Sequence, residues 1–259
     1  MSSTTLAVDI NSDMGERAES LWDSSEEQLM RFVTSANIAC GGHAGDPTSM
    51  QATVWLAKKY GVCVGAHPSF PDQKNFGRIQ MQLSRDEIRK TVHNQIEALG
   101  EVCSQLRCQL THVKPHGALY NVAVKNLEIA AAIAEGTKLW SSEVILVGLA
   151  GSEMIEVWKD AGFRVAEEAF VDRAYEADGT LRSRDHDDAL LTDAEKATQR
   201  TIELIKTGTV AAIDGTILRL HPTTLCIHSD TPGSYLLART LREGLRKAGV
   251  DVKPLITLT

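Results

Sequence analysis

Short apolar runs alternate with amphipathic stretches along most of the chain. Each run is four to seven residues long and rich in Val, Ile or Leu, which is typical of parallel strands buried on both faces. The predicted strands are Leu6–Ile10, Ala36–Ala39, Val62–Ala66, Leu110–Val113, Glu143–Leu149, Phe163–Glu168, Thr224–Ile227 and Val250–Leu255. Strands that alternate with helices indicate an α/β fold built on a parallel sheet.

The predicted helices have clear end signals. Ser84 and Glu87 have the spacing of a capping box, and Asp46 is a good N-cap ahead of a proline at the first helical position. From Ile88 to Leu106 apolar residues recur every three or four positions, which predicts one long helix. Further helices are expected at 192–206 and 236–248.

One stretch breaks the alternation. The segment 210–220 holds Asp214-Gly215 between apolar residues, which predicts a β-hairpin inserted before the next strand. No linker, repeat or change of composition divides the chain. We therefore expect 1–259 to form a single β/α barrel domain, closed or nearly closed, rather than an open sheet.

Composition narrows the class of protein. A hydrophobic content of 43% excludes a disordered chain, and a net charge of −7 argues against binding to a nucleic acid backbone. No apolar run approaches the ~20 residues that span a bilayer. The first basic residue, Arg17, follows a strand-like segment near Leu6, so no secretory signal is visible, and the five cysteines form no C-x-x-C pair. We expect a cytoplasmic protein with neither nucleic acid nor membrane as a partner.

Polar residues are concentrated where the predicted strands end. Asp9, Asn11 and Asp13 alternate along the first strand and its continuation, so they share one face. Five of the eight histidines also lie at such ends: His43, His67, His112, His116 and His228. In a barrel the carboxyl ends of the strands converge on the active site. The charged stretch 182–188, in contrast, is expected to be solvated.

These residue types suit several kinds of chemistry. Carboxylates and imidazoles at a barrel mouth could hold a divalent ion or move protons, and Lys114 could stabilise a developing oxyanion. A calcium loop is excluded, because its sixth position here is Met14 and its twelfth is Ser20. The sequence has no phosphate-binding loop, dinucleotide fingerprint or nucleophile elbow.

Ordered blocks of sequence resemble the LamB/YcsF family between about residues 8 and 250. The blocks are D-x-N-x-D-x-G-E at 9–16, S-A-N-I-A-C-G-x-H-A-G-D-P at 35–47, G-A-H-P at 65–68, F-G-R at 76–78, H-V-K-P-H-G-A-L-Y-N at 112–121, E-A-F-V-D-R-A-Y at 168–175 and H-S-D-T-P at 228–232. Four positions depart from the family's usual residues. Gly42 replaces an aromatic residue, Ser69 and Ser229 replace glycines, and Ile79 replaces a second arginine. The segment 17–25 also looks shortened.

The resemblance implies a fold and an activity. The fold would be a distorted seven-stranded β/α barrel, similar to the glycoside hydrolase/deacetylase superfamily. The activity would be the ATP-dependent opening of the lactam of 5-oxo-L-proline to L-glutamate. The chain would work with two other 5-oxoprolinase subunits, of the B and C types, and ATP with Mg²⁺ would be used by the complex.

The strand ends and the matched blocks together predict a set of site residues. Candidate catalytic residues are Asp13, His43, His67, Lys114 and His116, and Asp13, His43 and His67 are also the candidates for a metal site. Candidate substrate-binding residues are Asp9, Asn11, Asn37, Asp46, Arg78, Asp172, Arg173, His228 and Asp230. Two alternatives stay open at this point: a stand-alone metal-dependent amidase or deacetylase, and a non-catalytic substrate-binding subunit.

Overall fold

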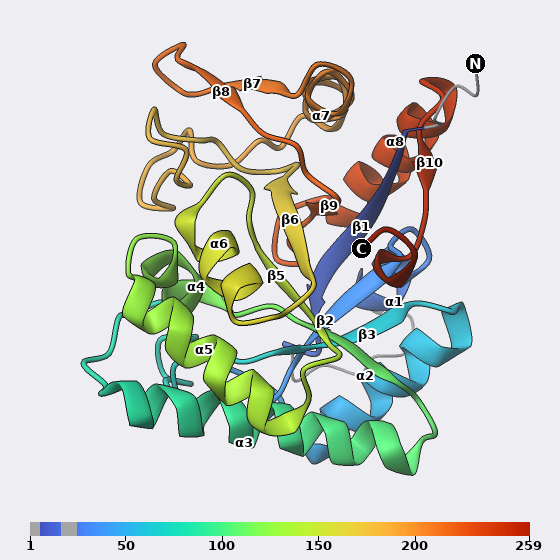
Figure 1. Cartoon of the computed structure of the whole chain (residues 1–259). Helices are drawn as coiled ribbons and strands as arrows, with labels where there is room; N and C mark the ends of the chain where they lie inside the picture. The colour runs from blue at the N-terminus through green and yellow to red at the C-terminus, as the bar shows by residue number, and fades with distance from the viewer. Residues whose placement is uncertain (1–5, 17–24) are drawn as a thin grey trace.

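The computed structural model describes residues 6–16 and 25–259. Seven parallel strands follow one another around a barrel, and the seventh pairs with the first, so the ring is closed (Figure 1). In order around the ring they are β1 (Ala7–Met14), β2 (Ser35–Ala39), β3 (Cys63–His67), β4 (Leu110–Val113), β5 (Ile145–Leu149), β6 (Val165–Phe170) and β9 (Thr224–Cys226). This confirms the predicted (β/α)7-type barrel.

Helices surround the barrel. They are α1 (Ser25–Met30), α2 (Pro47–Tyr60), α3 (Arg85–Gln105), α4 (Gly117–Ala123), α5 (Leu127–Trp140), α6 (Glu153–Asp160), α7 (Ala194–Thr207) and α8 (Ser234–Lys247). The capping box of Ser84 and Glu87 is present at the start of α3, and Asp46 caps α2. Within the described residues, no helix is long and apolar enough to cross a membrane. Arg17 and Ser20, which were named in the sequence analysis, lie outside the described residues.

Two strand boundaries differ from prediction by three residues or more. Strand β1 runs four residues past Ile10 to Met14, although its second half is polar on one face. At the other end of the chain, only β10 (Asp251–Val252) pairs, with the first residues of β1, and it adds to the sheet without joining the ring. Pro254 has no N–H to continue a strand, and a 3₁₀ helix (Leu255–Thr257) follows.

The predicted hairpin is present as a separate two-stranded sheet, β7 (Thr209–Ala211) with β8 (Ile217–Arg219). It projects from the barrel beside the long connection between β6 and α7 (Figure 1). The backbone N–H of Ile213 donates to the carbonyl of Tyr175, 2.9 Å away, and so ties the hairpin to that connection.

The barrel interior is unusually polar. On β1, Val8, Ile10 and Met14 belong to the apolar core between strands and helices, whereas the alternate residues Asp9 and Asn11 bond to side chains of other strands inside the ring. Barrel interiors are ordinarily filled by branched apolar side chains. The polar filling here positions the groups of the site described next.

Candidate active site

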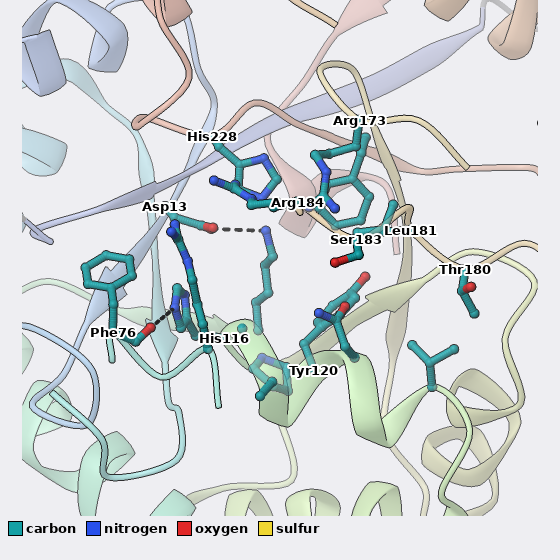
Figure 2. Close-up of a pocket in the computed structure, with 18 of the residues that line it drawn as sticks. Asp13, Phe76, His116, Tyr120, Arg173, Thr180, Leu181, Ser183, Arg184 and His228 are labelled. Carbon is teal, nitrogen blue, oxygen red and sulfur yellow. Dashed lines mark hydrogen bonds and ion pairs between the residues drawn. The ribbon is translucent and has the colours of Figure 1, made fainter. Parts of the chain in front are cut away.

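A cavity of about 460 Å³ opens at the carboxyl ends of the strands. Its wall combines residues from the strand ends with the connection between β6 and α7, which Figure 2 shows on the side opposite Phe76 and His116. Of the predicted site residues, the cavity is lined by Asp13, His67, Arg78, Lys114, His116, Arg173, His228 and Asp230. The ends of the strands therefore bring most of the predicted site residues together.

Lys114 forms the floor of the cavity. Its Nζ lies 3.0 Å from Oδ1 of Asp13 and 2.9 Å from Oε1 of Glu168, and its side chain is almost fully buried. Burial disfavours the ammonium ion, but the Asp13 and Glu168 carboxylates outweigh it and raise the pKa of Lys114 well above its usual value. Lys114 is therefore a fixed positive charge and cannot serve as a base at neutral pH.

Asp13 is a buried carboxylate that lines the cavity. Its Oδ1 accepts from Lys114 and from Asn37 Nδ2, and its Oδ2 lies 3.3 Å from Nε2 of His67. Burial opposes ionisation, but interactions with His67 and Lys114 hold the pKa of Asp13 well below its ordinary value. An ionised carboxylate with one oxygen toward a pocket can orient a water molecule or accept its proton.

A layer of amide and imidazole side chains lies beneath this floor. Asn11 Nδ2 donates to Glu168 Oε1 over 3.0 Å, and its Oδ1 accepts from Asn37 Nδ2. The Oδ1 of Asn37 in turn accepts from Nε2 of His112, which lies within β4 and not at its end. These side chains hold Asp13 and Glu168 in place and do not line the cavity.

Asp9 lies one layer deeper. Its Oδ1 accepts from the hydroxyls of Thr34 and Ser35, and its Oδ2 accepts from Thr224. Burial raises the pKa of Asp9 to about 6 despite these hydrogen bonds. Asp9 is thus a structural group of the barrel interior.

Three imidazoles gather at one side of the mouth. The rings of His43 and His116 stack with centroids 3.6 Å apart, and His67 packs edge-on against His116. Burial lowers the pKa of His43 to about 4 and that of His116 well below its usual value. Glu16 joins this cluster, with Oε1 2.8 Å from Nε2 of His43.

Arg173 and Arg184, from the connection between β6 and α7, lie on the opposite rim (Figure 2), and Arg78 lies on the imidazole side beside Phe76. Asp230 accepts from Arg78 over 2.6 Å and from Arg184 over 2.7 Å, so it bridges two loops across the mouth. Arg173 donates to the carbonyl of Arg182, while its buried Nε has no hydrogen-bond partner among the described residues. Burial, followed by the charge of Arg184, lowers the pKa of Arg173 to about 10, so it stays cationic at neutral pH.

His228 is positioned from behind by Asp172. The carboxylate accepts from the backbone N–H of His228 and lies 3.0 Å from its Nδ1, and it also accepts from the hydroxyl of Thr231. Burial opposes ionisation, but the charge and hydrogen bonds of His228 lower the pKa of Asp172 to about 2. Asp172 does not engage the other ring nitrogen, Nε2, which can therefore contact a ligand in the cavity that His228 lines.

Asp46 lies apart from these groups. Its carboxylate accepts from the backbone N–H groups of Thr48 and Ser49 at the start of α2, and it does not line the cavity. The capping geometry accounts for this residue without any contact to a ligand.

Three residues of the site, Glu16, Glu168 and Arg184, are missed by sequence reasoning. Glu168 is the last residue of the predicted strand 163–168, and this place at a strand end was a usable signal, although β6 continues to Phe170. Glu16 closes the first sequence block, which was the signal available for it. Arg184 lies in the stretch expected to be solvated. That expectation is wrong for this residue, which reaches the cavity because it pairs with Asp230.

Comparisons with known proteins agree with this architecture. The sequence model of the LamB/YcsF family matches residues 8–259. The chain is 48% identical to the A-type 5-oxoprolinase subunit of Chloroflexus aurantiacus and 43% identical to that of Pyrococcus furiosus, covering 96% of this chain and 98% of each relative. A crystal structure of the lactam utilization protein from Thermus thermophilus superposes with a TM-score of 0.89 at 41% identity, over 96% of this chain and 100% of that one.

The match covers almost the whole length of both partners in each comparison, and it includes the strand ends that carry the cavity residues. The chain belongs to the LamB/YcsF family.

Proposed function

We propose that the chain is one component of an ATP-dependent 5-oxoprolinase that opens the lactam of 5-oxo-L-proline to L-glutamate. The relatives, which are named as A-type subunits of 5-oxoprolinase, support this reading over 98% of their length. The strongest support for this proposal in the structure comes from the cavity. It combines a cationic wall for a small anion with an ionised carboxylate beside imidazoles.

A five-membered lactam resists water, which is why ATP is needed. In the proposed reaction the amide oxygen takes the γ-phosphoryl group and ADP leaves. Water then adds to the ring carbon, the C–N bond breaks, and the resulting acyl phosphate is hydrolysed to glutamate and phosphate. ATP with Mg²⁺ is used by the complex with the B- and C-type subunits.

The residues of this chain have distinct parts in that reaction. Arg173 binds the substrate carboxylate, because it is a buried cation whose Nε–H has no partner among the described residues and which lines the cavity wall. Asp13 orients the attacking water and accepts its proton through Oδ2. Lys114 is already engaged by Asp13 and Glu168, so it stabilises negative charge from the floor and does not bind the substrate directly.

The test is glutamate release from 5-oxo-L-proline, ATP and Mg²⁺, by this chain alone and with both partner subunits. We expect release only in the mixture. In the same mixture, Asp13→Asn and His67→Ala each lower kcat strongly, and Arg173→Gln raises KM for the lactam about tenfold or more. Arg85→Gln, which removes an exposed arginine on α3, is the matched control and leaves both constants unchanged. No release from any mixture of folded subunits would contradict the proposal.

A further inference from the structure

Four donor atoms of the imidazole side of the mouth converge on one point. They are Oε1 of Glu16, Nε2 of His43, Nε2 of His67 and Nδ1 of His116, and the four residues can place one such atom each within 4.8 Å of the others. They come from the ends of four consecutive strands, β1 to β4. All three histidines are buried, and Glu16 is nearly so.

The hydrogen bonds around His67 and His116 define which ring nitrogens carry protons. Nδ1 of His67 lies 2.7 Å from the backbone carbonyl of Lys114, and Nε2 of His116 lies 3.0 Å from that of Phe76. A carbonyl oxygen only accepts, so each of these nitrogens must bear the hydrogen. In a neutral imidazole the other nitrogen then has a bare lone pair.

Those two bare nitrogens face each other. Nε2 of His67 and Nδ1 of His116 are only 2.9 Å apart, and two lone pairs cannot form a hydrogen bond. A cation between them removes the conflict. Ligating histidines commonly donate the outer N–H to a backbone carbonyl, which orients the ring and fixes its tautomer, and both rings do so here.

The surroundings of Glu16 support the same conclusion. Its ion-pair contacts among the described residues are all with imidazoles, at 2.8 Å from His43, 3.4 Å from His116 and 4.0 Å from His67. Asp13 nearby is compensated by Lys114, whereas Glu16 meets no lysine or arginine in the part of the chain that the structure describes. A buried carboxylate without a cation is costly, and a divalent ion would compensate it.

We propose that Glu16, His67 and His116, with His43 as a fourth and weaker ligand, bind one divalent transition-metal ion of the Zn²⁺ type. Nitrogen-rich sites suit zinc and its neighbours, whereas Mg²⁺ and Ca²⁺ prefer oxygen. Tetrahedral zinc bonds of about 2.0–2.1 Å would place ligand atoms roughly 3.3 Å apart. The separations of 2.8, 2.9, 3.4 and 4.0 Å scatter around that value.

His43 is the weaker ligand for a structural reason. For its Nε2 to offer a lone pair, Nδ1 must carry the hydrogen, and that buried nitrogen has no partner among the described residues. This assignment differs from the predicted set of Asp13, His43 and His67. Asp13 is instead the neighbouring oxygen, 3.3 Å from Nε2 of His67. A bound ion would supply Lewis acidity at the mouth of the cavity.

The experiment is a titration of the chelator-treated full-length chain with Zn²⁺, followed by calorimetry and by metal analysis after gel filtration. We expect one equivalent per chain. His67→Ala and His116→Ala each weaken binding at least about 100-fold, Glu16→Gln weakens it about tenfold or more, and His43→Ala has the smallest effect. Circular dichroism establishes that each variant is folded. The assay needs neither ATP nor partner subunits, so its outcome is separate from that of the proposed function.

His228→Ala is the matched control. His228 belongs to a second group of donors with Asp13 and Cys226, so it tests whether the ion binds there instead. We expect His228→Ala to bind Zn²⁺ as the wild type does. Loss of binding in this variant with retention in His116→Ala would overturn the assignment, as would the absence of stoichiometric binding in the wild type. Nitrogen-15 spectra that show a proton shared between His67 and His116 in the presence of Zn²⁺ would also overturn it.

Discussion

Nζ of Lys114 on the loop after β4 lies 2.9 Å from Oε1 of Glu168 on β6, inside the barrel, where both side chains are almost completely shielded from water. Glu168 also accepts from Asn11 and from the hydroxyl of Tyr120. The pair links the floor of the cavity to β6, which is separated from β4 by β5 alone. Its energetics differ from those of an exposed ion pair, because neither charge can be solvated if the other is removed.

Lys114→Met should therefore destabilise the protein by about 3–5 kcal/mol, since two buried carboxylates lose their cation. Combining it with Glu168→Gln should recover part of that loss. The exposed pair of Lys125 and Asp178 provides the control, because Lys125→Met should cost at most about 1 kcal/mol. Chemical denaturation of these variants and the wild type measures the differences. Equal losses for Lys114→Met and Lys125→Met would contradict a buried charge network.

Asp9 predicts an unusual dependence of stability on pH. Its pKa is about 6 in the fold and near 3.8 when unfolded, so the folded state binds the extra proton between these values. Asp9 contributes most to the free energy of unfolding below about pH 4. Up to about 3 kcal/mol of this stability is lost as the pH rises through 6. Asp9→Asn cannot titrate. The difference in free energy of unfolding, Asp9→Asn minus wild type, should therefore increase between about pH 4 and 7.

Asp172→Asn is the control for that measurement. The pKa of Asp172 is lowered to about 2, so its contribution is fully present above its unfolded pKa near 3.8 and is lost only as the pH falls through 2. The difference between Asp172→Asn and the wild type should consequently stay nearly constant from about pH 4.5 to 5.5, where that of Asp9→Asn already changes. A flat difference for Asp9→Asn over the same range would show that Asp9 is ionised in the fold throughout.

Two departures from the family's usual residues, Gly42 and Ser69, lie against each other in the structure. A Cβ on Gly42 would overlap Oγ of Ser69 and Oε1 of Gln95. Gln95 cannot move freely, because it bonds to both the backbone N–H and the carbonyl of Ser69. Gly42→Ala should cost about 1–3 kcal/mol. In a Ser69→Gly/Gln95→Ala background the same change should cost less than about 0.5 kcal/mol.

A double-mutant cycle of thermal or chemical unfolding tests this coupling. A penalty for Gly42→Ala that is the same in both backgrounds would mean that the overlap is relieved by movement of the backbone. The expected result would instead indicate that Gly42 and Ser69 are coupled, because the side chains of Ser69 and Gln95 leave no room for a Cβ at position 42.

The sequence was informative wherever local pattern decides structure. The strands, the caps at Asp46 and Ser84, and the hairpin at Asp214-Gly215 all depend on residues within a few positions of one another. The strand ends also predicted most of the cavity, because the topology of a parallel barrel brings them together. Asp46 stands in one of the family's sequence blocks, although capping alone accounts for its geometry.

The features that could not be predicted from the sequence depend on interaction partners that are distant along the chain. The pattern predicts an end of β1 at Ile10 because Asn11 and Asp13 look like loop residues until other strands supply their hydrogen-bond partners. Arg184 looks solvated in isolation, and only Asp230, 46 residues later, accounts for its position. The polarity of a barrel interior cannot be inferred from local hydrophobicity, since an inward polar residue and a loop residue look alike.

The closure of the ring has a consequence for how the chain acquires its structure. Asp9 on β1 bonds to Thr224 on β9, 215 positions away, and the register of these strands completes the barrel. During synthesis from the N-terminus, β1 can pair with β2 early. Its other neighbour in the ring, β9, is made only when nearly the whole chain has been synthesised. Until then one of its edges and its carboxylate-bearing face are unpaired. We therefore expect closure to be a late, slow step, and chains released before residue 226 to be prone to association through this edge.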